Sequence, residues 1–247
     1  MNIIAFIPSR YDSTRFPGKP LAPIAGEPMI RRVFRCAASC PEVSQVYVAT
    51  DDARISQCVD KFGGKAIMTA KEHISGTDRI FEAAQKLHLK NEDLIVNIQG
   101  DQPVFDPGII SEMIAPLVND RDIPMATLKY RITDKKEIEN INIVKVVTDN
   151  AGFALYFSRH PIPFYRDKGS SEVHYKHLGL YAFRKGFLEK FNRLPVGRLE
   201  AAEKLEQLRA LEHGFKIKVV ETASDSIEVD TPEDIKRAED LIKRSSK

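Results

Sequence analysis

Several features that mark common protein classes are missing from this chain of 247 residues. No segment approaches the roughly 20 apolar residues that a membrane-spanning helix needs, and the opening apolar run is too short and lacks the basic start of a secretory signal. The nucleotide-binding patterns G-x-x-x-x-G-K-[ST] and G-x-G-x-x-G are absent from the opening loop. With no internal repeats and no low-complexity tract, we expect a globular protein with no membrane partner.

Cysteine and net charge are scarce as well. The three cysteines, Cys36, Cys40 and Cys58, form an odd set without metal-ligand spacing, so we expect reduced thiols and a cytoplasmic protein. The formal net charge is only +2 and Lys and Arg are spread along the chain, which argues against a nucleic-acid partner. Any strongly positive site must therefore be local.

What the sequence does contain is an alternation of strand-like and helix-like segments. Strands are expected near 3–7, 45–50, 66–68, 94–99 and 124–130. Apolar residues recur at helical spacing in 29–39, 52–62, 80–87 and 107–119. This order predicts an α/β fold with a single doubly wound, mostly parallel sheet.

The pattern changes after residue 144. Consecutive strands are expected at 144–148, 153–158 and 175–183, around a polar loop at 160–175. We therefore expect one domain, residues 1–247, with residues 150–184 as a small antiparallel insert beside the sheet. Further along, 199–213 predicts one continuous helix, and a short strand at 228–230 precedes a helix with Pro232 in its first turn.

The loop after the first strand carries the clearest chemical signal. Residues 3–7 form a short apolar run, and the polar segment that follows contains Arg10, Arg15 and Lys19. Open α/β sheets bind ligands at the carboxyl ends of their strands, and cations set among backbone and hydroxyl donors suit a polyphosphate. The alternative is an ordinary basic surface loop.

Two later segments are candidates for the same edge of the sheet. Asp101 follows the strand near 94–99, where its carboxylate can hold a hard cation beside phosphates; the alternative is an Asx turn. Gly100, just before it, allows close approach of the backbone. Residues 75–79 precede a helix, and on local chemistry alone this segment is simply an N-cap.

These segments together resemble the CMP-Kdo synthetase family, the 3-deoxy-manno-octulosonate (Kdo) cytidylyltransferases. The motifs that carry the resemblance run along nearly the whole chain: Pro8-Ser9-Arg10, Ser13-Thr14-Arg15, Pro17-Gly18-Lys19-Pro20-Leu21, Ser75-Gly76-Thr77-Asp78-Arg79, Gln99-Gly100-Asp101, Leu205-Glu206-Gln207-Leu208-Arg209 and Val229-Asp230-Thr231-Pro232-Glu233-Asp234. The resemblance implies the fold of the nucleotide-diphospho-sugar transferases and a transfer from CTP to a sugar acid, giving the CMP-sugar and pyrophosphate for lipopolysaccharide assembly. It also implies Mg²⁺ as cofactor and a homodimer, with the insert as substrate lid and dimer contact.

The resemblance further implies roles for individual residues. It makes Arg10, Lys19 and Asp101 catalytic, with Asp101 and Asp230 as the ligands of Mg²⁺. At the nucleotide it places Arg10, Ser13, Arg15, Lys19, Ser75, Gly76, Arg79 and Gln99. On the sugar side it places Arg159, His177, Tyr181, Glu206 and Gln207.

One position departs from the usual family pattern. The common form is Q-G-D-E-P, whereas this chain has Gln102 in place of the Glu. A subgroup that uses an 8-amino analogue of the sugar acid shares Q-G-D-Q-P, and segments 194–200 and 225–230 are similar to that subgroup as well. The expected sugar is therefore Kdo or its 8-amino-3,8-dideoxy analogue. Two other hypotheses stay open: the same fold acting on another sugar acid or sugar phosphate, and a non-catalytic nucleotide-binding module.

Overall fold

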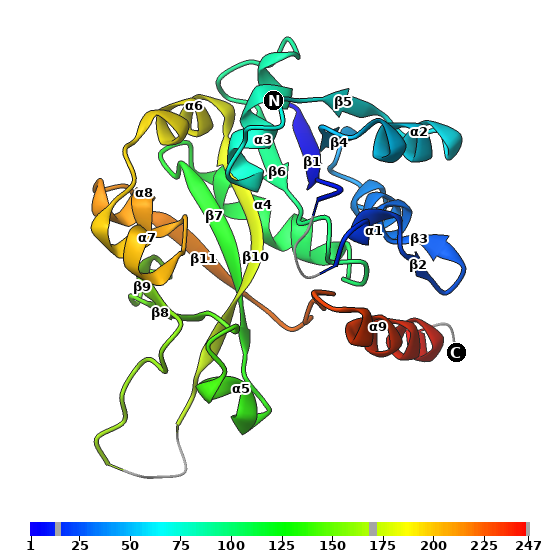
Figure 1. Ribbon diagram of the computed structural model, residues 1–247. Coiled ribbons are helices and arrows are strands. Elements are labelled where there is room, and N and C mark those ends of the chain that lie inside the picture. The colour runs from blue at the N-terminus through cyan, green and yellow to red at the C-terminus, as the bar shows by residue number, and fades with distance from the viewer. Residues whose placement is uncertain (13–15, 168–171, 246–247) are drawn as a thin grey trace.

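A large twisted sheet runs through the centre of the computed structural model, which describes residues 1–12, 16–167 and 172–245 (Figure 1). Its main path has the order β11-β7-β10-β6-β1-β4-β5, and β8 and β9 form a ribbon attached to β10. The strands of this sheet are β1 (Ile3–Ser9), β4 (Gln45–Thr50), β5 (Ala66–Met68), β6 (Leu94–Asn97), β7 (Met125–Arg131), β8 (Lys145–Thr148), β9 (Ala154–Ser158), β10 (Tyr175–Arg184) and β11 (Ile217–Thr222). A separate hairpin pairs β2 (Pro23–Ile24) with β3 (Glu27–Pro28).

The pairing confirms a mostly parallel α/β sheet. β1 pairs in parallel with both β4 and β6, β4 with β5, and β7 with β11. The position predicted for part of the insert was wrong, because β10 does not lie beside the sheet. It runs up from the β8–β9 ribbon and pairs antiparallel with both β6 and β7 (Figure 1). Its residues Leu178, Leu180 and Ala182 are buried in the main core, which explains why this strand belongs to the centre of the sheet.

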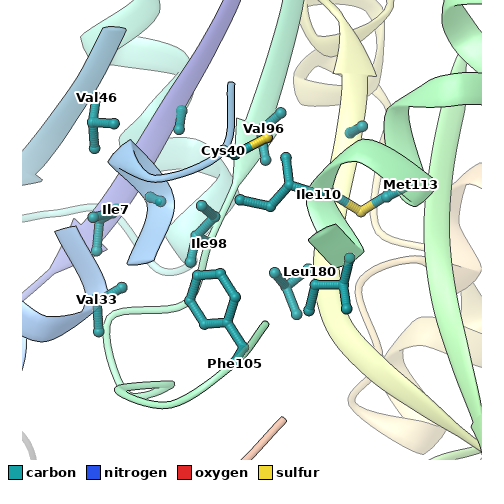
Figure 2. Close-up of a cluster of buried hydrophobic side chains, with 14 of the residues drawn as sticks. Ile7, Val33, Cys40, Val46, Val96, Ile98, Phe105, Ile110, Met113 and Leu180 are labelled. Atoms are coloured by element: carbon teal, nitrogen blue, oxygen red, sulfur yellow. The ribbon is translucent and has the colours of Figure 1, made fainter. Parts of the chain in front are cut away.

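Helices cover both faces of the sheet. Along β1, Ile3, Ala5 and Ile7 belong to one core cluster, whereas Ile4 and Phe6 belong to the other. The first cluster receives residues of α1 (Met29–Ala38), α2 (Ala53–Lys61), α4 (Gly108–Asn119) and α9 (Pro232–Ser245). The second receives residues of α3 (Gly76–Gln85), α6 (Lys185–Arg193) and α8 (Leu208–Glu212). Figure 2 shows Ile7 of β1, Val96 of β6 and Ile110 of α4 converging in the first cluster.

Three details differ from the expected secondary structure. The continuous helix expected at 199–213 is two short helices, α7 (Arg198–Glu203) and α8, because Lys204 adopts a left-handed conformation with φ 54°. Helix α6 has no counterpart among the predicted elements, and its Phe187, Leu188 and Phe191 pack into the second cluster. No strand forms at 228–230, and the residue before this segment, Ile227, makes only an isolated bridge to Val104.

The remaining elements are short. They are the 3₁₀ turn η1 (Lys19–Leu21) in the opening loop and helix α5 (Lys135–Glu139) near the β8–β9 ribbon. Across the described parts of the chain, every helix is too short or too polar to cross a membrane.

Candidate active site

The site begins where β1 and β6 end side by side. Pro8 to Arg10 leave β1, and Gly100 and Asp101 follow β6, its parallel neighbour. A Cβ atom on Gly100 would lie 2.8 Å from Ser9 Oγ and 2.9 Å from the Pro8 carbonyl oxygen, so any larger residue would push the two strand ends apart. The close approach expected at Gly100 is confirmed, and it brings Asp101 to the edge that carries Arg10.

A cavity of about 230 Å³ opens at this edge, and we call it the smaller cavity. Its lining contains most of the residues that were expected at the nucleotide: Arg10, Lys19, Ser75, Gly76, Arg79 and Gln99. Two others, Ser13 and Arg15, lie outside the residues that the structure describes. The structure thus brings together segments that lie far apart in the chain, from Pro8 to Asp230, and sets Arg10, an exposed cation, at the cavity.

The segment from Ser75 to Arg79 is a helix cap and a cavity wall at once. The Ser75 hydroxyl accepts a hydrogen bond from the Asp78 backbone N–H at 3.0 Å, and the Asp78 carboxylate accepts one from the Ser75 N–H, which completes a capping box. The Arg79 guanidinium is buried and pairs with Asp51 at 3.1 Å. Arg79 therefore forms part of the wall, with its charge already neutralised by Asp51.

A second cavity, of about 770 Å³, lies beside the first and we call it the larger cavity. All five residues that were expected on the sugar side line it: Arg159, His177, Tyr181, Glu206 and Gln207. The Arg159 guanidinium is held by backbone carbonyls, with Nε donating to Glu203 at 2.7 Å and Nη1 to Ile141 at 3.0 Å. Gln207 is buried, and its Nε2 has no hydrogen-bond partner among the described residues. That amide therefore has spare donors at the wall of the cavity.

Gln99, Asp101 and Asp230 line both cavities and so mark the border between them. The Lys19 ammonium lies between the two carboxylates, 2.8 Å from Asp101 Oδ2 and 3.4 Å from Asp230 Oδ1. The backbone contributes as well, because the Val229 N–H donates to the Asp101 carbonyl at 2.9 Å and sets the following Asp230 against Asp101. Two acids 129 positions apart in sequence are thereby held around one cation.

The break between α7 and α8 aims Glu206 at the border of the cavities. The Glu206 carboxylate accepts hydrogen bonds from the hydroxyls of Ser75 at 3.2 Å and Thr77 at 2.9 Å, which ties this turn to the start of α3. Desolvation raises the pKa of Glu206 to about 7. A buried ion pair between Arg209 and Glu200, with Nη2 to Oε1 at 2.6 Å, stabilises the same turn. The solvated polar face that a single helix would have had is absent at these positions.

His177 and Tyr181 have shifted proton affinities for the same reason. Desolvation lowers the pKa of His177 to about 3, so its ring is neutral near pH 7, and its Nε2 lies 2.9 Å from Thr127 Oγ1. Desolvation, followed by the charges of Glu206 and Glu228, raises the pKa of Tyr181 well above its usual range. The larger cavity therefore offers these neutral ring groups beside charged side chains of both signs.

Sequence reasoning missed Glu228, which lines the larger cavity. Its Oε1 accepts a hydrogen bond from Gln102 Nε2 at 3.2 Å, and loss of hydration, with the charge of Asp101, raises the pKa of Glu228 to about 7. The departure at Gln102 was visible in the sequence, but nothing local connects it with a residue 126 positions later. Only tertiary packing reveals the pair.

Comparisons with known proteins agree with this geometry. The sequence profile described as cytidylyltransferase matches residues 4–218. The chain is 54% identical over 97% of both chains to a 3-deoxy-manno-octulosonate cytidylyltransferase of Syntrophus aciditrophicus. It is also 54% identical, over 98% of this chain and 99% of the relative, to an 8-amino-3,8-dideoxy-manno-octulosonate cytidylyltransferase of Shewanella sp. strain ANA-3.

A solved structure of CMP:2-keto-3-deoxy-manno-octonic acid synthetase, complexed with CTP, superposes on the chain with a TM-score of 0.93. The two sequences are 40% identical, and the match covers 99% of this chain and 100% of that one. A 4-diphosphocytidyl-2C-methyl-D-erythritol synthase, 12% identical with a TM-score of 0.66 over 98% of both chains, shares the fold alone.

Proposed function

Because this chain belongs to the cytidylyltransferase family, we propose that it couples CTP to a 3-deoxy-octulosonic acid and releases pyrophosphate. The sugar is Kdo or its 8-amino analogue, since the chain is 54% identical to a relative named for each of them. The product would supply the activated sugar for lipopolysaccharide assembly. The observation that carries the proposal is the border itself: Asp101, Asp230 and Gln99 line two adjoining cavities. A transfer between two substrates needs such a place, where the reacting atoms of both can meet.

The side chains divide the work between the two cavities. In the smaller cavity, Arg10 and Lys19 supply positive charge for the triphosphate of CTP, and Ser75 and Gly76 adjoin its nucleoside. In the larger cavity, Gln207 and His177 offer polar groups that orient the sugar acid. The anomeric hydroxyl oxygen of the sugar bonds to the α-phosphorus, the bond from this phosphorus to the bridging oxygen breaks, and pyrophosphate leaves while the hydroxyl proton passes to solvent.

The two border carboxylates fit Mg²⁺. The side chains of Asp101 and Asp230 already surround the Lys19 ammonium, so the backbone holds them where a cation is favoured. Mg²⁺ requires only one or two carboxylates when waters and substrate phosphates complete its shell, so the lack of a larger cluster of His, Cys, Asp and Glu among the described residues is compatible with it. When bound, it would neutralise phosphate charge and make the sugar hydroxyl more acidic.

We also propose a homodimer in the cytoplasm. Leu155 of β9 is 62% exposed and Phe164 is 88% exposed, an apolar pair in the insert that a second copy could cover, whereas Phe157 of the same strand is fully buried core. The cysteines are free thiols, as expected in a reducing compartment. Light scattering should give about twice the chain mass of 27.9 kDa at micromolar concentration.

Pyrophosphate release with Mg²⁺ tests the activity. We expect release from CTP in the presence of Kdo or its 8-amino analogue, and little from ATP or GTP or with CTP alone. Release with a sugar phosphate or a sialic acid instead would favour another substrate for the same fold. No pyrophosphate release with any pair of nucleotide and sugar would favour a non-catalytic nucleotide-binding module. Such a module would not need two metal-binding carboxylates.

A further inference from the structure

Most carboxylates along the larger cavity have partners that neutralise or fix them. Lys19 pairs with Asp101 and Asp230, and Lys176 pairs with Glu137 at 3.1 Å and with Asp225 at 2.8 Å. Glu206 is fixed by two hydroxyl donors. These acids are therefore occupied by the protein itself.

Glu228 differs from all of them. Its side chain is exposed to the cavity, and within the described ranges no ion pair reaches it. Its hydrogen bond comes from Gln102 Nε2, a neutral amide, at 3.2 Å. A carboxylate that lines a cavity and forms no ion pair among the described residues can accept a positively charged ligand group.

Gln102 holds Glu228 from inside the protein and lines neither cavity. The residue is fully buried, and its Oε1 has no hydrogen-bond partner among the residues described. An ammonium has three donors and no acceptor, so the carboxylate of Glu228, held by the Gln102 amide, matches it. A Glu at position 102, the common family form, would instead set two carboxylates within hydrogen-bond distance, where like charges oppose each other.

The position of Glu228 near the border of the cavities suits the carbon-8 end of the sugar. Asp230 follows two residues later at the border, and a Cβ atom on Gly179 would lie 3.6 Å from Glu228 Oε1, so Gly179 leaves clearance on that side. In the ring form of an octulosonic acid, carbon 8 ends a short branch from the ring carbon that is bonded to the ring oxygen, and this oxygen is bonded to the anomeric carbon. A substituent at carbon 8 thus lies only a few bonds from the anomeric hydroxyl that reacts at Asp101 and Asp230.

We propose that Glu228, positioned by Gln102, binds the ammonium of an 8-amino sugar acid and makes that amino sugar the preferred substrate. This inference rests on the proposed cytidylyltransferase function. Glu228 contacts the substrate, and Gln102 acts through Glu228 as a positioning residue. With Kdo, whose carbon 8 carries a neutral hydroxyl, the carboxylate gains no charge-assisted contact.

The test compares kcat/KM for Kdo and for 8-amino-Kdo at saturating CTP and Mg²⁺, measured by pyrophosphate release. We expect the wild-type chain to prefer the amino sugar. Glu228→Gln should lower kcat/KM for the amino sugar by about tenfold or more, the usual effect of losing a charge-assisted contact, and change kcat/KM for Kdo less than about threefold. Gln102→Leu should lower the same preference by a smaller factor.

Glu221→Gln is the matched control, because Glu221 is a half-exposed carboxylate on β11 outside both cavities. It should change neither rate, and retained turnover of Kdo by Glu228→Gln shows that this variant is folded. Equal losses for both sugars, no loss for either, or a wild-type preference for Kdo would overturn the inference and leave the proposed function standing. Turnover of neither sugar by the wild-type chain would overturn both.

Discussion

The two cavities are built from the chain in different ways. The smaller cavity collects short stretches that follow strand ends and the first turn of α3, at residues 8–10, 19–20, 73–79 and 99–101. The larger cavity collects stretches and single residues from more distant segments, which range from Gln99 to Arg237. In the first, sheet topology brings most of the groups together, and of the described residues only Asp230 comes from a distant segment. In the second, tertiary packing does so, and the shifted pKa values of His177 and Glu206 record the desolvation that this packing imposes. We therefore expect substitutions in the larger cavity to change the preferred sugar without changing the fold.

The largest effects are expected at the border, where the two cavities depend on the same residues. Asp101→Asn and Asp230→Asn should each lower turnover roughly a hundredfold or more, because an uncharged amide is a poor ligand for Mg²⁺. The melting temperature should change little. Asp106→Asn is the control, since Asp106 is an exposed carboxylate that accepts a hydrogen bond from the Gly108 N–H. Loss of this hydrogen bond should lower the free energy of unfolding by about 1 kcal/mol at most, without a large change in turnover. Near-normal turnover by Asp230→Asn would show that Asp230 is not a ligand of the metal.

Lys19→Met should have the next largest effect. Removal of the ammonium loses a charge-assisted contact to the triphosphate, so CTP affinity or turnover should fall about tenfold or more. It also leaves Asp101 and Asp230 without the cation between them, so the variant should melt at a lower temperature in EDTA and recover in Mg²⁺. Lys61→Met, at an exposed lysine that ends α2, should show neither change. A CTP affinity equal to that of the wild type would contradict a role for Lys19 at the triphosphate.

A pair of variants distinguishes the cavities by their substrates. Arg10→Gln should raise KM for CTP about tenfold and leave KM for the sugar nearly unchanged. Gln207→Leu should do the reverse, raising KM for the sugar about fivefold through the loss of its free amide donors. Steady-state kinetics with one substrate varied at a time would measure both. If either variant changed the two KM values alike, the division between the cavities would be wrong.

The smallest effect concerns pH. The pKa of Glu206 is raised from 4.5 to about 7 in the folded chain, so the folded state binds more protons than the unfolded state between those values. The stabilisation from protonated Glu206 is complete below about pH 4.5 and is lost as the pH rises through about 7. The melting temperature of the wild type, relative to that of Glu206→Gln, should therefore fall by a few degrees over this range. A constant difference would mean that Glu206 is ionised throughout.

Much of the fold and of the smaller cavity could be predicted because the signals are local. The opening strand and its loop, the capping residues at Ser75, and Gly100 before Asp101 are each readable within a few residues. The predictions that failed concern features that depend on tertiary contacts. Lys204 in a left-handed conformation splits an otherwise regular helical pattern because Glu206 and Leu208 gain partners on α3 and in the core. The pairing of Gln102 with Glu228 depends on packing between distant segments, which no periodicity reports.

The measurement that tests the account most directly is a crystal structure of the Asp101→Asn variant with CTP, Mg²⁺ and the sugar acid, a variant expected to react too slowly to consume them. The account predicts the nucleoside and triphosphate in the smaller cavity beside Arg10, the sugar in the larger cavity beside Gln207, and the anomeric hydroxyl facing the α-phosphorus next to Asp230. Both substrates in one cavity, or a sugar bound away from Asp230, would contradict it.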